Sequence, residues 1–177
     1  MVKVYLGLGG NVGKVSETFD TAAIEIENLI GRILNKSSRY RTEPWGNKNQ
    51  DYFLNQVLCV ETSLNAEDVL KEILAIEKKL GRDRNMDNQF APRTIDIDIL
   101  FYGEKIINNN SLSVPHPRLH IRNFVLTPLM EIAPDLIHPL FNKKIKDLVK
   151  DNPDDSLVKK ETSPQATTFG SFKRRDT

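Results

Sequence analysis

Two aspartates lie two positions apart in the stretch RTIDIDIL, residues 93–100. Alternating isoleucines indicate a β-strand, on which successive side chains point to opposite faces. Asp96 and Asp98 are therefore expected on one face and the isoleucines on the other. Two bare carboxylates side by side repel each other, and a hard divalent cation such as Mg²⁺ between them makes the arrangement favourable. Taken alone, the pattern fits the solvated face of an amphipathic strand equally well.

Several arginines accompany the aspartate pair in the sequence. They are Arg82, Arg84, Arg93, Arg118 and Arg122. Guanidinium groups beside a carboxylate-bound metal are suited to holding a polyphosphate, so the combination predicts phosphoryl transfer. The polar segment from Arg82 to Arg93 is expected to act as a lid that excludes water from the phosphates.

A second set of residues could bind a flat heterocycle. Asn55 interrupts an apolar strand, and its amide offers both donors and acceptors, although a structural cross-strand amide explains it almost as well. The nearby aromatic residues could stack a ring or belong to the core. They are Trp45, Phe53, Phe90 and Phe124. His116 lies between two prolines that stiffen its backbone, and a surface turn is its simpler interpretation.

The glycine-rich stretch GLGGNVGK, residues 7–14, is not a nucleotide loop. A Walker loop would need glycine where Leu8 stands and Ser or Thr where Val15 stands. The dinucleotide-binding pattern would need a third glycine at the position of Val12. Any nucleotide is therefore expected to bind elsewhere.

These residues must be positioned by alternating strands and helices. Residue periodicity and end signals predict the order strand, helix, strand, strand, helix, strand. The ranges are 3–9, 16–31, 32–44, 52–64, 65–81 and 94–103, with Ser16 and Asn65 as N-caps and a hairpin after the last strand. This order predicts an α+β, ferredoxin-like βαββαβ fold, with an antiparallel sheet and both helices on one face. Residues 115–150 are expected to extend it with a short helix and a final helix.

Length and composition predict one domain over residues 1–150, followed by a loosely ordered tail over 151–177. A net charge of +1 gives no field that would attract nucleic acid or a membrane surface. The single cysteine, Cys59, is expected to be a buried apolar residue, without a disulfide or a metal. No apolar stretch approaches the length of a membrane span and no signal peptide is visible, so we expect a cytoplasmic location. The protein is also expected to be a monomer.

The ordered set of motifs resembles the 6-hydroxymethyl-7,8-dihydropterin pyrophosphokinase family of folate biosynthesis. The resemblance covers residues 2–140 and rests on YLGLGGNVG, SSRYRTEPWG, YFLNQV, GRDR, PRTIDIDILFYG and VPHPRLHIRNFVLTPLMEIAP. The family transfers the β,γ-pyrophosphoryl group of ATP to the hydroxymethyl oxygen of the pterin and releases AMP.

The resemblance also implies roles for individual residues. Asp96 and Asp98 would bind two Mg²⁺ ions, and together with Arg82 and Arg93 would form the catalytic set. The ATP-binding residues would be Glu77, Arg84, Arg93, Ile99, His116 and Arg122, with Ile99 acting through its backbone. The pterin-binding residues would be Thr42, Pro44, Trp45, Phe53, Asn55 and Phe124. Tyr40 would support the site from nearby, and Gly9 and Asn11 would lie close to the pterin pocket.

The chain departs from the family pattern at Gly10, where serine is usual, and at NQFAPR, residues 88–93, which replaces Trp-Gly-Pro-Arg. Three other functions fit a fold of this class. An RNA-binding module would need exposed aromatics and a basic surface, which the sequence does not show. A regulatory small-molecule-binding domain would not explain the paired aspartates and arginines. A different ATP-dependent transferase fits the residues equally well, because only the resemblance identifies the pterin.

Overall fold

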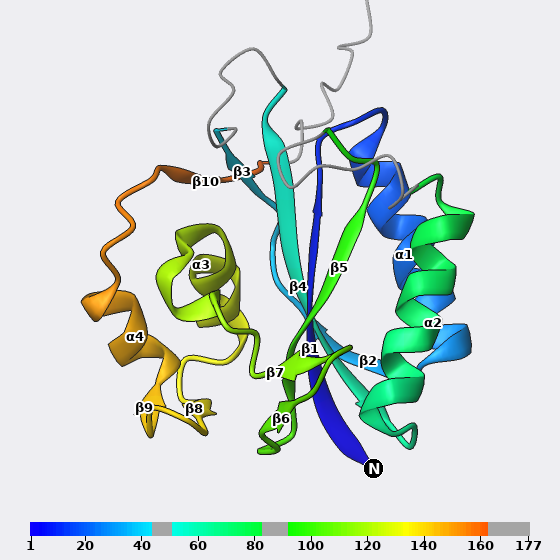
Figure 1. Cartoon of the computed structure of the whole chain (residues 1–177). Helices are drawn as coiled ribbons and strands as arrows, with labels where there is room; N and C mark the ends of the chain where they lie inside the picture. The colour runs from blue at the N-terminus through cyan, green and yellow to red at the C-terminus, as the bar shows by residue number, and fades with distance from the viewer. Residues whose placement is uncertain (44–50, 83–91, 163–177) are drawn as a thin grey trace, which may run out of the picture.

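The computed structural model describes residues 1–43, 51–82 and 92–162. The chain forms a central antiparallel sheet covered by helices on both faces (Figure 1). The first half contains β1 (Val2–Gly10), α1 (Val15–Leu29), β2 (Arg32–Lys36), β3 (Tyr40–Thr42), β4 (Phe53–Thr62), α2 (Ala66–Lys79) and β5 (Asp96–Tyr102). The second half contains β6 (Ile107–Asn108), β7 (Ser113–Val114), a 3₁₀ turn (Leu119–Ile121), α3 (Asn123–Ile132), β8 (Ile137–His138), β9 (Lys143–Lys144), α4 (Ile145–Asp151) and β10 (Val158–Lys160).

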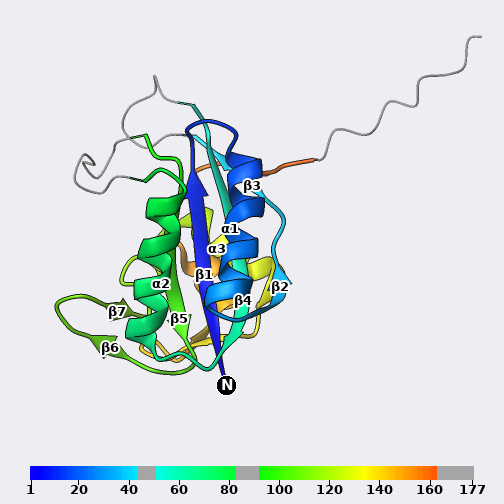
Figure 2. The same cartoon turned by 90° about the vertical axis from the view of Figure 1, so that its right-hand side faces the viewer.

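The main sheet has the strand order β10-β3-β4-β1-β5, and β2 also pairs with β4. Helices α1 and α2 lie side by side on one face, as the sequence predicts (Figure 2). Helices α3 and α4 cover the opposite face (Figure 1). Two apolar clusters fill the two layers, one between the sheet and α1 and α2, the other between the sheet and α3 and α4. The predicted order of elements is confirmed, and in the second layer α3 packs against β4 and β3.

Three local predictions change in the structure, and the first two concern the start of α1 and the strand predicted over residues 32–44. Helix α1 begins at Val15 with Lys14 at the N-cap, so Ser16 is not the cap. The predicted strand 32–44 is divided into β2 and β3 around Ser37, whose backbone N–H and hydroxyl both bond to Val57 of β4. Asn65 does cap α2, since its side chain accepts a hydrogen bond from the Asp68 N–H.

The segment after residue 150 is the third difference. Asp151 ends α4, and β10 pairs antiparallel with β3 at the edge of the sheet, so residues 151–162 do not begin a loosely ordered tail. Backbone pairing with β3 holds Val158–Lys160, and the polar composition of the segment carries no signal of such pairing with an open sheet edge. The remainder, residues 163–177, lies outside the described part of the chain. Within the described ranges, no helix combines the length and apolar character that crossing a membrane requires.

His138 of β8 is buried in an aromatic cluster beneath α3 and α4. Its Nδ1 accepts a hydrogen bond from the Leu140 N–H at 3.3 Å, and its ring stacks on Phe141 at 4.3 Å between centroids. Burial, aided by nearby His120, lowers the pKa of His138 to about 4. The residue is therefore neutral at physiological pH and serves the core.

This lowered pKa predicts a loss of stability in acid. The unfolded chain binds a proton at His138 below pH 6.5 that the folded chain takes up only near pH 4, so stability falls as pH falls through this window. His138→Phe should reduce the loss by about 1–3 kcal/mol. Urea unfolding of both proteins at about pH 7 and about pH 4.5 measures the difference. Equal losses in the two proteins would contradict the assignment.

Candidate active site

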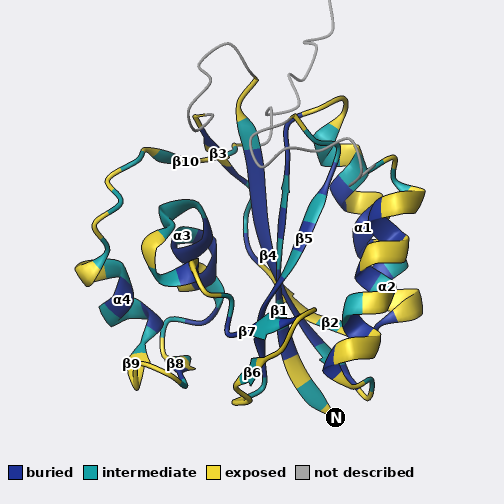
Figure 3. Cartoon of the chain, in the orientation of Figure 1, coloured by how far each residue is buried: buried dark blue, intermediate teal, exposed yellow. Residues whose placement is uncertain are grey.

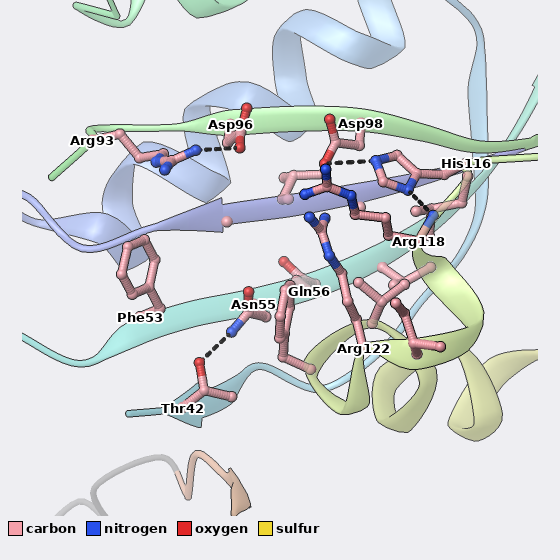
Figure 4. Close-up of a pocket in the computed structure, with 18 of the residues that line it drawn as sticks. Thr42, Phe53, Asn55, Gln56, Arg93, Asp96, Asp98, His116, Arg118 and Arg122 are labelled. Atoms are coloured by element: carbon pink, nitrogen blue, oxygen red, sulfur yellow. Dashed lines mark hydrogen bonds and ion pairs between the residues drawn. The ribbon is translucent and has the colours of Figure 1, made fainter. Parts of the chain in front are cut away.

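A cavity of about 660 Å³ opens on the α3 face of the sheet (Figure 4). Strands β1, β4 and β5 form its floor, and β3, α3 and the turn before α3 form its walls. Its polar lining includes Thr42, Glu43, Asn55, Gln56, Arg82, Arg93, Asp96, Asp98, His116, Arg118 and Arg122. Among the described lining residues, four arginines face three carboxylates, so the cavity suits a polyanion.

Two glycines of β1 create the open floor. Gly7 and Gly9 lie on the cavity face, whereas Leu6 and Leu8 pack into the core on the other side. In register, Gly9 lies between Asn55 of β4 and Asp96 of β5. A Cβ atom at Gly9 would come within 3.4 Å of the Asn55 Oδ1. The glycine-rich stretch thus keeps side chains off the sheet surface between the two sets of predicted binding residues.

Asp96 is held between two arginines. Its Oδ1 lies 2.8 Å from Nη1 of Arg82, and its Oδ2 lies 2.9 Å from Nη1 of Arg93. Arg82 also donates from Nη1 to the Ile95 carbonyl at 3.0 Å. The predicted alternation of β5 is confirmed, since Ile97 and Ile99 belong to the core on the opposite face. These contacts place two predicted phosphate-binding arginines beside a predicted metal ligand.

Asp98 lies on the same face of β5 and is more exposed than Asp96, with a side-chain exposure of 42% against 23%. Its Oδ2 is 3.9 Å from Nε2 of His116. Nδ1 of His116 accepts a hydrogen bond from the Arg118 N–H at 3.1 Å, so the neutral ring carries its proton on Nε2. Burial and then the charges of Arg122 and Arg118 lower the pKa of His116 to about 4. At neutral pH this residue is a directed N–H donor into the cavity.

The predicted pterin-side residues meet at the other end of the cavity. The Asn55 Nδ2 donates to the Thr42 Oγ1 at 3.0 Å, which leaves the Asn55 Oδ1 beside Gly9 (Figure 4). Phe53 and Phe124 both line the cavity, from β4 and from α3. The guanidinium of Arg93 lies over the Phe53 ring at 5.9 Å, and that of Arg122 lies over the Phe124 ring at 5.6 Å. An amide and two aromatic faces can bind a flat polar ring.

Asn11 connects the end of β1 to the base of this site. Its Oδ1 accepts from the Arg93 N–H at 2.9 Å, and its own N–H donates to the Arg93 carbonyl at 3.0 Å. Its Nδ2 donates to the Asp51 carbonyl at 3.4 Å. Asn11 therefore positions Arg93 through the backbone and does not line the cavity itself.

Three residues named by the resemblance lie behind the cavity. Ile99 points its side chain into the core between the sheet and the first two helices. Tyr40 donates its hydroxyl proton to Glu131 of α3, and burial raises its pKa to about 12. Glu77 of α2 is buried and accepts a hydrogen bond from the Ile97 N–H at 2.7 Å. Glu77 thus holds the strand segment between the two aspartates.

This role of Glu77 predicts a loss of stability on its removal. Glu77→Ala leaves the buried Ile97 N–H without its carboxylate acceptor, and the free energy of unfolding should fall by about 1–3 kcal/mol. Glu77→Gln keeps an acceptor oxygen and should lose less. Denaturant unfolding of the three proteins tests this, and equal stability of Glu77→Ala and the wild type would contradict it.

Several lining residues were not predicted. Gln56, Val57, Leu100, Ile121 and Val125 line the cavity. Arg118 also lines it, as expected for one of the arginines grouped with the aspartate pair, although the resemblance implies no individual role for it. The amide pair at positions 55 and 56 was a usable signal for Gln56. The apolar lining residues carry no such sequence signal, because they resemble ordinary core residues. The predicted residues Pro44, Trp45, Arg84 and Phe90, and the lid between Arg82 and Arg93, fall on segments outside the described residues.

Comparison with known sequences decides the family. Residues 5–134 match the family described as 7,8-dihydro-6-hydroxymethylpterin-pyrophosphokinase, HPPK. The chain belongs to the HPPK family. The matched range contains every residue of the cavity lining.

Relatives agree with this membership. The chain is 41% identical over 152 residues to a 2-amino-4-hydroxy-6-hydroxymethyldihydropteridine pyrophosphokinase of Aquifex aeolicus, covering 86% of this chain and 93% of the relative. It is 46% identical over 138 residues to the folic acid synthesis protein fol1 of Pneumocystis carinii, covering 77% of this chain and 18% of that protein.

Solved structures of the HPPK-DHPS protein of Plasmodium falciparum share the fold. The wild type crystallised with pteroate has a TM-score of 0.70 at 18% identity and aligns with 85% of this chain. The chain spans 44% of the length of that structure. At this identity the likeness concerns the fold alone.

Proposed function

We propose that the chain transfers the β,γ-pyrophosphoryl group of ATP to the hydroxyl of 6-hydroxymethyl-7,8-dihydropterin and releases AMP. The observation that carries the proposal is the cavity itself. It joins a carboxylate pair flanked by arginines to an amide flanked by aromatic rings, within a chain of the HPPK family. The first half suits a metal-bound polyphosphate and the second half suits a pterin.

Asp96 and Asp98 are the proposed ligands of two Mg²⁺ ions. Both present hard oxygen donors on one face of β5, and Mg²⁺ commonly takes one or two carboxylates, with phosphate oxygens and water completing its shell. The metal supplies charge neutralisation on the phosphates and polarises the reacting groups. We assign Arg82, Arg93, His116 and Arg122 to the triphosphate, with Arg84 and the backbone at Ile99 as further ATP contacts. His116 contributes an N–H donor and not a positive charge.

Thr42, Phe53, Asn55 and Phe124 are the proposed pterin contacts, together with Pro44 and Trp45. The hydroxymethyl oxygen attacks the β-phosphorus, the bond from this phosphorus to the α,β-bridging oxygen breaks, and AMP leaves with that oxygen. The hydroxyl proton is released to solvent. Arginines that face both Asp96 and the phosphates stabilise charge that develops on the bridging oxygens, so positioning and electrostatics account for the catalysis.

Incubation with ATP, Mg²⁺ and 6-hydroxymethyl-7,8-dihydropterin, followed by ion-exchange chromatography of the nucleotides, tests this proposal. AMP formed only in the presence of pterin supports it, and chelation of the metal should stop the reaction. Formation of ADP would indicate a single-phosphate kinase and overturn the assignment. Nucleotide binding without turnover would instead favour a regulatory domain.

The fold is also assigned to the ferredoxin-like class. The strand order β3-β4-β1-β5, with α1 after β1 and α2 after β4, supports this assignment. The monomeric state and the cytoplasmic location remain predictions, the first of which light scattering after size exclusion can measure.

A further inference from the structure

The segment of residues 152–161, here called the strap, leaves α4, passes α3 and reaches the edge of the sheet (Figure 1). Much of it is exposed or only partly buried (Figure 3). It lies beyond residues 5–134, the range that matches the HPPK family. Its side chains nevertheless make specific contacts at two places that border the cavity.

The first contact is at the beginning of α3. Oδ2 of Asp154 accepts a hydrogen bond from the Asn123 N–H at 2.7 Å. The Asn123 side chain donates in return to the Ser156 carbonyl at 2.8 Å. A carboxylate at this position satisfies a backbone donor of the first helical turn and interacts favourably with the helix dipole. Burial opposes ionisation of Asp154. The hydrogen bonds that its carboxylate accepts from Asn123 and Ser156 outweigh this effect and lower its pKa.

The second contact is with β3. Strand β10 pairs Val158 with Thr42 and Lys160 with Tyr40. The Glu161 N–H donates to the Arg39 carbonyl at 2.7 Å, and its carboxylate lies 2.9 Å from Nη2 of Arg41. Strand β3 has only three residues, and without the strap it would be the edge strand here. The strap therefore gives β3 a partner on each side.

Both contacts fix residues that line the same end of the cavity. Asn123 lies between Phe124, which lines the proposed pterin subsite, and Arg122, which is assigned to the triphosphate and whose guanidinium lies over the Phe124 ring at 5.6 Å. On β3, Thr42 holds the Asn55 amide at 3.0 Å. The strap thus connects the wall that carries Phe124 to the wall that carries Thr42, and both walls border the proposed pterin subsite.

We propose that the strap positions the two walls of the pterin subsite, with Asp154 as a positioning residue that acts through the first turn of α3. This inference rests on the proposed function for the identity of the ligand. Among the described residues, the hydrogen bonds and strand pairs of the strap reach α3 and β3, whereas Asp96 on β5 is held by Arg82 and Arg93. Loss of the strap contact should therefore weaken pterin binding more than it weakens the binding of ATP.

Adjacent aspartates provide a matched test in the full-length chain. Asp154→Ala removes the acceptor for the Asn123 N–H, Asp154→Asn keeps an acceptor oxygen, and Asp155→Ala changes an exposed neighbour. Pterin affinity is measured by titrating intrinsic fluorescence, alongside KM for ATP, amide hydrogen exchange of residues 122–126 and thermal unfolding.

Asp154→Ala should weaken pterin binding by about fivefold to tenfold and speed exchange in the first turn of α3. Asp154→Asn should recover most of the pterin affinity and most of the exchange protection, and Asp155→Ala should match the wild type in both measurements. Unchanged exchange would overturn the contact, and faster exchange with unchanged pterin affinity would overturn the positioning role. An equal loss of pterin and ATP affinity would also overturn it, because it would indicate general destabilisation. Failure of the proposed function would appear in the wild type, which would then not bind pterin.

Discussion

Replacing Asp98 with alanine is expected to lower kcat at least about a thousandfold while the chain remains folded. Asp98 is a proposed metal ligand, and its loss would remove one of the two carboxylates proposed to bind the phosphate-associated Mg²⁺. Its side chain is 42% exposed at the cavity surface, so its removal costs little packing. Loss of one member of the pair also relieves carboxylate repulsion with Asp96.

The measurement is steady-state AMP formation at saturating ATP and Mg²⁺, together with denaturant unfolding. Glu104→Ala is the matched control, because it removes an exposed carboxylate just beyond the far end of β5 and should leave kcat unchanged. Kinetics of Asp98→Ala equal to those of the wild type would rule out the metal assignment. A collapse of stability in this variant would show that the carboxylate serves the fold.

Replacing Arg93 with alanine is expected to lower kcat by about a hundredfold to a thousandfold and to change KM by less than about threefold. The guanidinium lies 2.9 Å from Asp96 and faces the proposed phosphate site. Its charge is needed most in the transition state, when negative charge develops on the departing AMP. The substitution leaves the segment in place, since Asn11 holds Arg93 through backbone atoms.

Separate determination of kcat and of KM for each substrate tests this prediction. Arg93→Lys keeps the charge without the planar two-donor geometry, so its kcat should lie between those of Arg93→Ala and the wild type. Arg32→Ala, at an exposed position of β2, serves as the control. A raised KM with an unchanged kcat in Arg93→Ala would contradict the prediction, because it would indicate that the residue binds substrate and transition state alike.

The sequence alone predicts the elements whose signals are local. The alternation of β5 places both aspartates on one face, and the structure confirms it because the pleat of a strand imposes a period of two. Asn65 and Gly81 mark the ends of α2, and Gly81 has a φ of +90° that favours glycine. The family was also recognisable from ordered motifs. Local geometry and local hydrogen bonds suffice for these predictions.

Tertiary structure alone decides which distant residues meet. Strand register places Gly9 between Asn55 and Asp96 and so opens the cavity floor, which no local pattern of β1 reveals. Glu77 reaches Ile97 only because α2 packs beside β5. The polar composition of residues 151–162 predicted disorder, yet pairing with β3 and the Asp154 cap of α3 hold them in place. Such contacts join residues separated by dozens of positions, and their energy depends on the register and packing of the whole sheet.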